Sequence, residues 1–234
     1  MTASGSVARG GDADRLNEFV SIASHELRAP IAVVHGIAAT LDARVDELPG
    51  EQLHALLGHL VVQTDRLRDL ADQLLDLSRI ESGAAAGPPE PFDPGARLEE
   101  LVPRIAGDRA GDVHLLIEPG RTVVTDPVAF ERVAANLILN ALRYGAPPVE
   151  VRLECDPCLL IVEDRGPGVA PAFVPHLFER FSRSDESRRS DATGSGLGLS
   201  IASAYAKALG GELAYEPAEP CGARFTLSLP AARS

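Results

Sequence analysis

Two groups of side chains in this sequence could do chemistry, and the first is a histidine beside a glutamate. The segment FVSIASHELRAP places His25 and Glu26 in an otherwise apolar run. A neutral imidazole is a nucleophile near neutral pH, and a neighbouring carboxylate can hold its ring proton and fix its tautomer. Periodicity alone favours a simpler interpretation, in which the two side chains form a solvated pair on a polar helix face.

The second group is suited to binding a phosphorylated ligand. The segment GSGLGL, residues 194–199, opens a predicted helix, where glycines let the backbone approach phosphates and free N–H groups attract anions. It is not a Walker A loop, because no Gly-Lys-Ser/Thr follows, and it lacks the context of a dinucleotide fingerprint. Asp164 ends a predicted buried strand before Gly166 and Gly168. Its carboxylate could accept from an exocyclic amine such as that of adenine.

A predicted helix adds two amides to this group. Asn136 and Asn140 are four residues apart and so share one helix face, and Arg143 and Tyr144 close the helix. Amide oxygens suit Mg²⁺, which takes few protein ligands and keeps water and phosphate. Two asparagines on a helix are usually ordinary exposed polar residues. Here they occur together with the glycine segment and the aspartate, and the three features together indicate a nucleotide site.

The histidine lies on the first of two long predicted helices. Apolar residues recur at helical spacing over residues 12–45 and again over about 53–80, and DELPG between them supplies a turn. With Leu16 as origin and about 100° per residue, His25 falls near 180° from the apolar stripe and so points outward. Two helices cannot bury stripes of this length, so we expect a second copy to complete a dimeric four-helix bundle.

The nucleotide group lies in a second predicted domain, an α+β sandwich over residues 95–234. The Gly-, Ala- and Pro-rich segment 83–94 predicts a linker from the hairpin domain, residues 12–82, and residues 1–11 predict a disordered leader. CDPC, residues 155–158, predicts a hairpin turn, because no further ligands complete a metal site. The predicted helices are about 95–106, 127–142 and 196–209, and the predicted strands are 113–117, 122–125, 149–154, 159–162, 211–215 and 223–229.

Composition argues against several partners. A net charge of −12 over 234 residues and a pI near 4.9 disfavour nucleic acid and adhesion to an anionic membrane. No apolar run is long enough to span a membrane, and the first residues lack the apolar core of a signal peptide. Three cysteines without a disulfide framework suit a reducing compartment, so we expect a cytoplasmic chain. The short leader cannot hold a sensor domain, so we expect a larger, membrane-bound sensor or input from a separate protein.

Five segments in this order resemble the catalytic core of the sensor histidine kinases of two-component signalling. SHELRAP resembles their phosphoacceptor motif, NLILNALRYG their asparagine motif and DRGPGV their first glycine motif. LFERFSRSD resembles their phenylalanine motif, and TGSGLGLSIA their second glycine motif. Each motif is weak alone, but the resemblance covers the chain from about residue 14, and the five together are highly specific.

The resemblance implies a dimerising phosphotransfer hairpin followed by a Bergerat-type ATP-binding domain. His25 would accept a phosphoryl group from ATP, with Glu26 as its base or orienting group, and would pass it to an aspartate of a response regulator. Asn140 would ligate Mg²⁺, and Asp164 would recognise adenine. The ATP-binding residues would be Asn136, Asn140, Arg143, Tyr144, Asp164, Gly166, Gly168, Arg183, Gly194, Gly196, Leu197 and Gly198.

Other positions refine what the resemblance implies. Residues 169–195 would form a mobile lid over ATP, anchored by Phe178 and Phe181. Arg143 stands where the family usually has lysine. The arginine keeps the positive charge but changes the geometry of its contacts. Ala29 stands where members that also dephosphorylate their partner usually carry Thr or Asn to orient a water, so we expect a strong kinase and a weak phosphatase. Two alternatives stay open here: another ATPase of the superfamily, such as an anti-sigma serine kinase, or a scaffold that only binds nucleotide.

Overall fold

The structure is a computed structural model, and it divides into two compact units, Met1–Leu75 and Asp76–Ser234. Side chains are described from Ser24 onward, except those of His25 and Cys155. Within the described residues no helix combines the length and the apolarity needed to cross a lipid bilayer. The described residues are 7–117, 120–155, 158–183 and 194–230.

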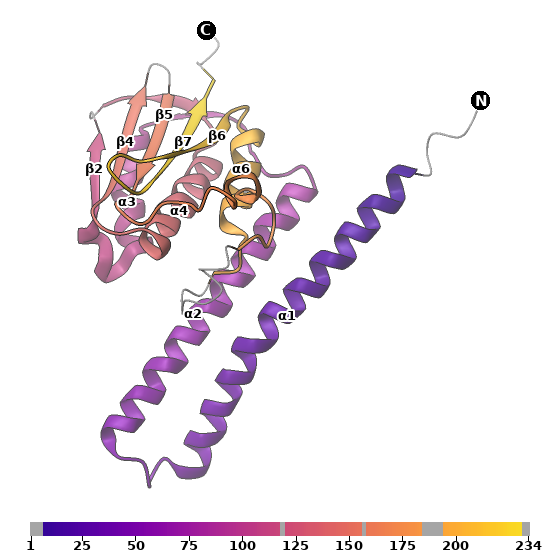
Figure 1. Ribbon diagram of the computed structural model, residues 1–234, viewed down its shortest axis with the longest axis vertical. Helices are drawn as coiled ribbons and strands as arrows, with labels where there is room; N and C mark the ends of the chain where they lie inside the picture. Colours follow the sequence, from indigo (N-terminus) through magenta and orange to yellow (C-terminus); the bar gives the residue numbers. More distant parts are fainter. Residues whose placement is uncertain (1–6, 118–119, 156–157, 184–193, 231–234) are drawn as a thin grey trace. The chain divides into compact units, whose positions relative to one another are not determined.

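The first unit is a helical hairpin, as predicted (Figure 1). It contains α1 (Val7–Arg44) and most of α2 (Gly50–Glu81). Helix α1 begins before residue 12, so part of the segment predicted as a disordered leader is helical. An established helix adds further residues at low cost, and no strong stop signal precedes residue 12. Ile37 of α1 and Leu70 of α2 are buried.

Helix α2 ends in a Schellman motif. Gly83 has a φ of 73°, a value that side chains other than glycine rarely adopt. The Ala84 N–H donates to the Arg79 carbonyl (2.8 Å), and the Gly83 N–H donates to the Ile80 carbonyl (3.1 Å). The helix therefore stops at a defined cap.

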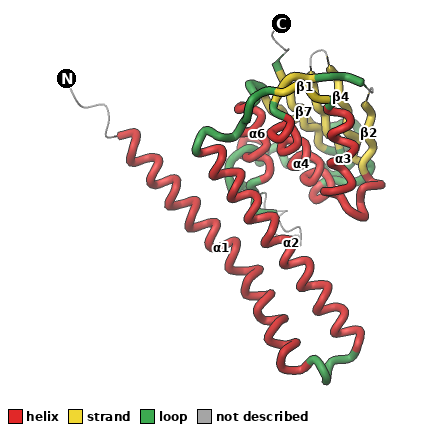
Figure 2. The backbone as a smooth tube through the Cα atoms, turned by 180° about the vertical axis from the view of Figure 1, so that it is seen from behind, coloured by secondary structure: helices red, strands yellow, loops and turns green. Residues whose placement is uncertain are grey.

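The second unit is a two-layer α+β sandwich, which also agrees with the prediction. Its five-stranded sheet has the order β2–β4–β5–β7–β6, in which only the β2–β4 pair is parallel. Seen from opposite sides, Figures 1 and 2 show the helices on one face of this sheet. The strands are β2 (Val113–Ile117), β4 (Val149–Cys155), β5 (Cys158–Glu163), β6 (Glu212–Pro217) and β7 (Ala223–Leu229). The helices are α3 (Pro94–Ala106), α4 (Pro127–Tyr144) and α6 (Gly198–Ala208), with 3₁₀ turns η1 (Gly107–Asp112) and η2 (Val174–His176).

The core lies between the sheet and these helices. Strand β5 alternates between buried and half-buried residues, because successive side chains point to opposite faces of a sheet. Leu160 and Leu227 of the sheet and Phe130 and Ile201 of the helices are at most 1 % exposed. This packing holds α4 against β5 and α6 against α4, and these elements carry the predicted nucleotide residues.

The segment 83–94, which we predicted as a linker, contains a strand. β1 (Glu90–Phe92) pairs antiparallel with β3 (Val123–Thr125). Phe92 meets Phe130 edge-on, with ring centroids 5.6 Å apart. A Pro-rich segment fits a linker and an edge strand equally well, because an edge strand leaves backbone N–H groups unpaired. Composition therefore could not separate the two.

Asp126 joins this segment to α4. Its Oδ1 accepts from the Val128 N–H (2.8 Å) and the Ala129 N–H (3.3 Å), so it is the N-cap of α4. Its Oδ2 accepts from the Gly87 N–H (2.6 Å). One carboxylate thus caps a helix and holds the chain that leads into β1.

Candidate functional site

Helix α4 carries the two predicted amides. Asn136 Nδ2 donates to the Arg132 carbonyl (2.8 Å), which orients the side chain. Asn136 Oδ1 faces the start of α6, where a methyl group on Gly198 would lie 3.1 Å from it. Asn140, one turn further, is half-buried and makes no side-chain hydrogen bond to another described residue. Its amide oxygen fits Mg²⁺, which prefers oxygen ligands.

The glycine segment before α6 packs closely against two other parts of the chain. Gly194 is buried, and a methyl group there would overlap the Tyr144 hydroxyl at the end of α4. Gly196 has a φ of 72°, and a methyl group there would lie 2.8 Å from backbone atoms of Phe181 and Ser182. The close approach of Gly194 to Tyr144 brings this segment near α4, and the positive φ and backbone contacts of Gly196 leave no room for a side chain there.

Asp164 lies where β5 ends, and it is 3 % exposed. Its Oδ1 accepts hydrogen bonds from the Gly166 N–H (2.8 Å) and the Ala223 N–H (3.4 Å). Burial raises the pKa of the Asp164 carboxyl, although both backbone hydrogen bonds oppose the shift. Within the described ranges no donor reaches Oδ2, so this oxygen can accept from a ligand amine.

The predicted phosphoacceptor lies in the first unit. His25 belongs to α1, but its side chain is outside the described residues, so the outward direction of the imidazole stays a prediction. Glu26 Oε2 lies 3.7 Å from Arg66 NH2 on α2, and each side chain is about one quarter exposed. This ion pair restrains the carboxylate next to His25. Arg66 is too distant in sequence for local spacing to indicate it.

Two family models match the chain. Residues 15–83 match the His Kinase A (phospho-acceptor) domain, and residues 125–233 match the histidine kinase-, DNA gyrase B- and HSP90-like ATPases. This chain belongs to the sensor histidine kinases. The phosphoacceptor match favours these kinases over the serine kinases of the same ATPase superfamily.

The similar kinases include both sequences and solved structures. The signal transduction histidine-protein kinase AfsQ2 of Streptomyces coelicolor is 35 % identical over 224 residues, which is 91 % of this chain and 41 % of AfsQ2. The histidine kinase AdeS of Acinetobacter baumannii superimposes with a TM-score of 0.69 and 26 % identity, over 89 % of this chain and 98 % of AdeS. Full-length ShkA in complex with AMPPNP has a TM-score of 0.62 and 27 % identity, over 93 % of this chain and 46 % of ShkA. The chain thus spans less than half the length of AfsQ2.

The kinase fold brings most of the predicted nucleotide residues together. Three close approaches join α4, the end of β5 and the glycine segment, and they connect Asn136 with Gly198, Tyr144 with Gly194, and Gly145 at the end of α4 with Asp164 and Gly166. Asn140 lies on the same helix, and Gly196 on the same segment as these residues. The remaining predicted features are placed differently or lie partly outside the described residues.

Leu197 and Gly168 do not contribute as simply as predicted. The Leu197 side chain is 1 % exposed and belongs to the core, and its N–H donates to Ser195 Oγ (3.1 Å). Gly168, with a φ of 73°, lies against the β6–β7 turn, where a methyl group would be 2.8 Å from the Gly222 carbonyl. Both residues shape the backbone around the site.

The remaining predicted residues lie at its edges. Arg143 is exposed on the last turn of α4, and Arg183 is half-buried after the segment that packs on Gly196. Within the predicted lid, residues 169–183 and 194–195 are described, and residues 184–193 lie outside the described part. The predicted anchors Phe178 and Phe181 are half-buried, whereas Leu177 is 5 % exposed.

Two glycines that enclose Asp164 were not among the predicted site residues. A methyl group on Gly145 would overlap the Asp164 carboxylate, and one on Gly222 would overlap the Asp164 backbone carbonyl. Gly145 is the C-cap of α4 and the last residue of the asparagine motif, so its position gave a signal. Gly222 lies far along the chain and gave none.

Proposed function

We propose that this chain transfers the γ-phosphoryl group of ATP to His25 and then to an aspartate of a response regulator. Asp164 carries the proposal: a buried carboxylate with one oxygen held by backbone N–H groups, enclosed by glycines, is suited to recognising adenine. The phosphoacceptor-domain match on the same chain supports His25 as the acceptor. The similarity to ShkA, whose structure contains AMPPNP, supports ATP as the donor.

In the proposed reaction, neutral His25 attacks the γ-phosphorus in line with the leaving oxygen. An N–P bond forms with one ring nitrogen while the O–P bond breaks, and ADP leaves. Glu26 holds the proton of the other ring nitrogen and takes it as positive charge develops. The product is a phosphoramidate that can pass its phosphoryl group to a regulator carboxylate. The Arg66 ion pair keeps the Glu26 carboxylate beside the phosphoacceptor position.

Asn140 would hold Mg²⁺, with Asn136 next to it. The amide oxygen of Asn140 suits this ion, and a bound Mg²⁺ would offset negative charge on the triphosphate. Arg143, exposed on the last turn of the same helix, adds a positive charge at this end of the site. The use of ATP places the proposed activity in the cytoplasm, where the chain would serve as the catalytic part of a larger sensor.

A homodimer is part of the proposal. The hairpin unit leaves large apolar side chains 43–60 % exposed, and burying them against a second copy would be favourable. They are Ile31, Val33, Val45, Leu57, Val61, Val62 and Leu75. A phosphatase activity of the dimer is expected to be weak, because Ala29 offers no side-chain hydrogen bond to a water.

The substitution His25→Gln should separate nucleotide binding from phosphoryl transfer. His25→Gln should bind AMPPNP with the affinity of the unsubstituted chain in calorimetry, because Asp164 and α4 are untouched. It should incorporate no label from γ-labelled ATP with Mg²⁺, and should pass none to a receiver domain. Full labelling of His25→Gln would contradict the assigned acceptor, and loss of AMPPNP binding would contradict the division between the two units.

A further inference from the structure

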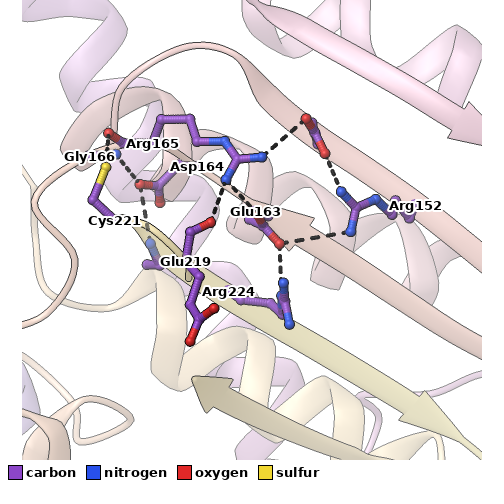
Figure 3. A network of polar contacts seen from close by, with 10 residues as sticks. Arg152, Glu163, Asp164, Arg165, Gly166, Glu219, Cys221 and Arg224 are labelled. Carbon is purple, nitrogen blue, oxygen red and sulfur yellow. Dashed lines mark hydrogen bonds and ion pairs between the residues drawn. The ribbon is translucent and has the colours of Figure 1, made fainter. Parts of the chain in front are cut away.

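Glu163, the residue before Asp164, is a buried carboxylate that the proposed reaction does not use. It is 2 % exposed, on the sheet face opposite to its neighbour Val162. Burying an unpaired charge is costly, and arginines surround this one (Figure 3). Arg224 Nε lies 2.7 Å from Glu163 Oε2, and Arg165 NH1 lies 3.0 Å from Oε1.

A second carboxylate makes the cluster larger. Glu150 of β4 lies directly across from Glu163 of β5, and like charges at such positions repel. Arg152 contacts both carboxylates, with its NH1 3.9 Å from Glu163 Oε2 and its NH2 in close contact with Glu150. Arg165 NH2 lies 3.3 Å from Glu150 Oε1. Arg152 and Arg165 therefore share the task of balancing the two negative charges.

Arg165 differs from the other arginines in reaching beyond the sheet. Its NH1 also donates to the Glu219 carbonyl (3.0 Å) in the β6–β7 turn, residues 218–222. The Cys221 thiol of the same turn donates to the Arg165 carbonyl (3.6 Å). Among the described residues, Arg152 and Arg224 make no hydrogen bond to this turn. Charge balance on Glu163 does not require the contact with Glu219.

The β6–β7 turn and Ala223, the first residue of β7 directly after it, close on Asp164. The Asp164 N–H donates to the Ala223 carbonyl (3.0 Å), and the Ala223 N–H donates back to Asp164 Oδ1 (3.4 Å). Gly222 approaches the Asp164 carbonyl so closely that no side chain fits between them. A shift of this turn would remove one donor from Oδ1 and free the carboxylate to rotate.

We propose that Arg165 is a positioning residue for base recognition, because it holds the β6–β7 turn against Asp164. The proposal rests on the proposed function, in which Asp164 accepts from the adenine amine. Guanine presents a carbonyl oxygen at that place, so a correctly oriented carboxylate rejects it. In this role Arg165 acts on base recognition through Asp164, without itself contacting the base or the phosphates.

Binding to three probes tests this role in the full chain with Mg²⁺: AMPPNP, GMPPNP and inorganic tripolyphosphate, each by calorimetry. Arg165→Gln should weaken AMPPNP binding about tenfold, as expected for the loss of a charge-assisted hydrogen bond. The preference for AMPPNP over GMPPNP should fall, and tripolyphosphate binding should not change. Arg152→Gln is the matched control, because it removes one arginine from the same carboxylates and leaves the turn contact intact.

Two further variants, Arg165→Lys and Asp164→Asn, also test the positioning role of Arg165. If Arg165→Gln does not fold, Arg165→Lys retains the charge beside Glu163 but cannot also bridge to Glu219, so base preference should still fall. Equal base preference in Arg165→Gln and Arg152→Gln, or equal weakening of AMPPNP and tripolyphosphate, would overturn the positioning role. Asp164→Asn should abolish the preference for adenine. Retained preference in Asp164→Asn would remove the base-recognition role of Asp164, and the role of Arg165 with it.

Discussion

The Tyr205 hydroxyl donates a 2.8 Å hydrogen bond to Asp76 Oδ1 and so joins α6 to the C-terminal part of α2. Asp76 is 3 % exposed, and its other oxygen lies 3.3 Å from Arg132 NH1 on α4. Burial, together with the hydrogen bond to Asp76, raises the pKa of Tyr205 to about 12. The end of α2 is thus held by two helices of the sandwich.

Removing this hydroxyl should destabilise the sandwich. Tyr205→Phe keeps the ring packing and leaves Asp76 with Arg132 alone, so we expect a loss of about 1–3 kcal/mol in unfolding free energy, the cost of an unsatisfied buried acceptor. Chemical denaturation of the nucleotide-free protein measures it. The raised pKa of Tyr205 means that its contribution is complete below pH 10 and is lost as the pH rises through about 12. Equal stability of both proteins at neutral pH would show that the bond contributes nothing.

Asp164→Asn should raise the thermal stability of the chain and lower its affinity for AMPPNP. Burial raises the pKa of this carboxyl in the folded chain. The protonated Asp164 carboxyl therefore favours the folded chain at pH values below its pKa in the unfolded chain. This contribution is lost as the pH rises through its pKa in the folded chain. At neutral pH without nucleotide, the neutral amide should raise the Tm by a few degrees, as about 1 kcal/mol does in a domain of this size. AMPPNP affinity should fall by at least about 100-fold, because the amide can present a donor to the adenine amine.

The pH dependence of this difference is a further check on Asp164→Asn. The Tm advantage over the unsubstituted protein should shrink as the pH falls through the pKa of folded Asp164, because the carboxyl then becomes neutral. An Asp164→Asn protein that is less stable than the unsubstituted chain at pH 7 would contradict the cost assigned to the buried carboxylate.

Gly145→Ala should impair nucleotide binding, because its methyl group would overlap the Asp164 carboxylate. We expect at least a tenfold loss of AMPPNP affinity, the scale of a displaced hydrogen-bonding group. Gly111→Ala is a matched control in the same unit, since a methyl group there meets no atom within 4 Å. Calorimetry measures the AMPPNP affinity of both variants. Equal affinity of Gly145→Ala and Gly111→Ala would contradict the close approach of Gly145 to Asp164.

Ala29→Thr should increase phosphatase activity. Ala29 is exposed on α1, four residues after His25, and a threonine hydroxyl there could orient a water toward a phosphorylated regulator. The measurement is the rate of phosphate release from a phosphorylated receiver domain with ADP present. Rapid release by the unsubstituted protein, with no increase in Ala29→Thr, would contradict the expectation of a weak phosphatase.

Much of the fold could be predicted from local sequence patterns. Apolar spacing indicated the hairpin, and Asp126 before Pro127 indicated the start of α4, because capping is a short-range interaction. The strand inside segment 83–94 could not be predicted, since it depends on pairing with β3, which follows α3 and β2 in the chain.

The candidate site divides in the same way. Asn136, Asp164 and the glycine segment were found because each motif is contiguous in sequence. Arg165 lies inside one of these motifs, but its role depends on Glu150 and Glu219, which only the sheet brings near it. Contacts between distant segments have no signature in a single sequence.

The position of the phosphoryl group tests the central claim most directly. The protein is incubated with γ-labelled ATP and Mg²⁺, and the modified peptide is identified by mass spectrometry under neutral conditions. We expect an acid-labile, base-stable phosphate on His25 and none in His25→Gln. A phosphate on a serine, an aspartate or another histidine would contradict it.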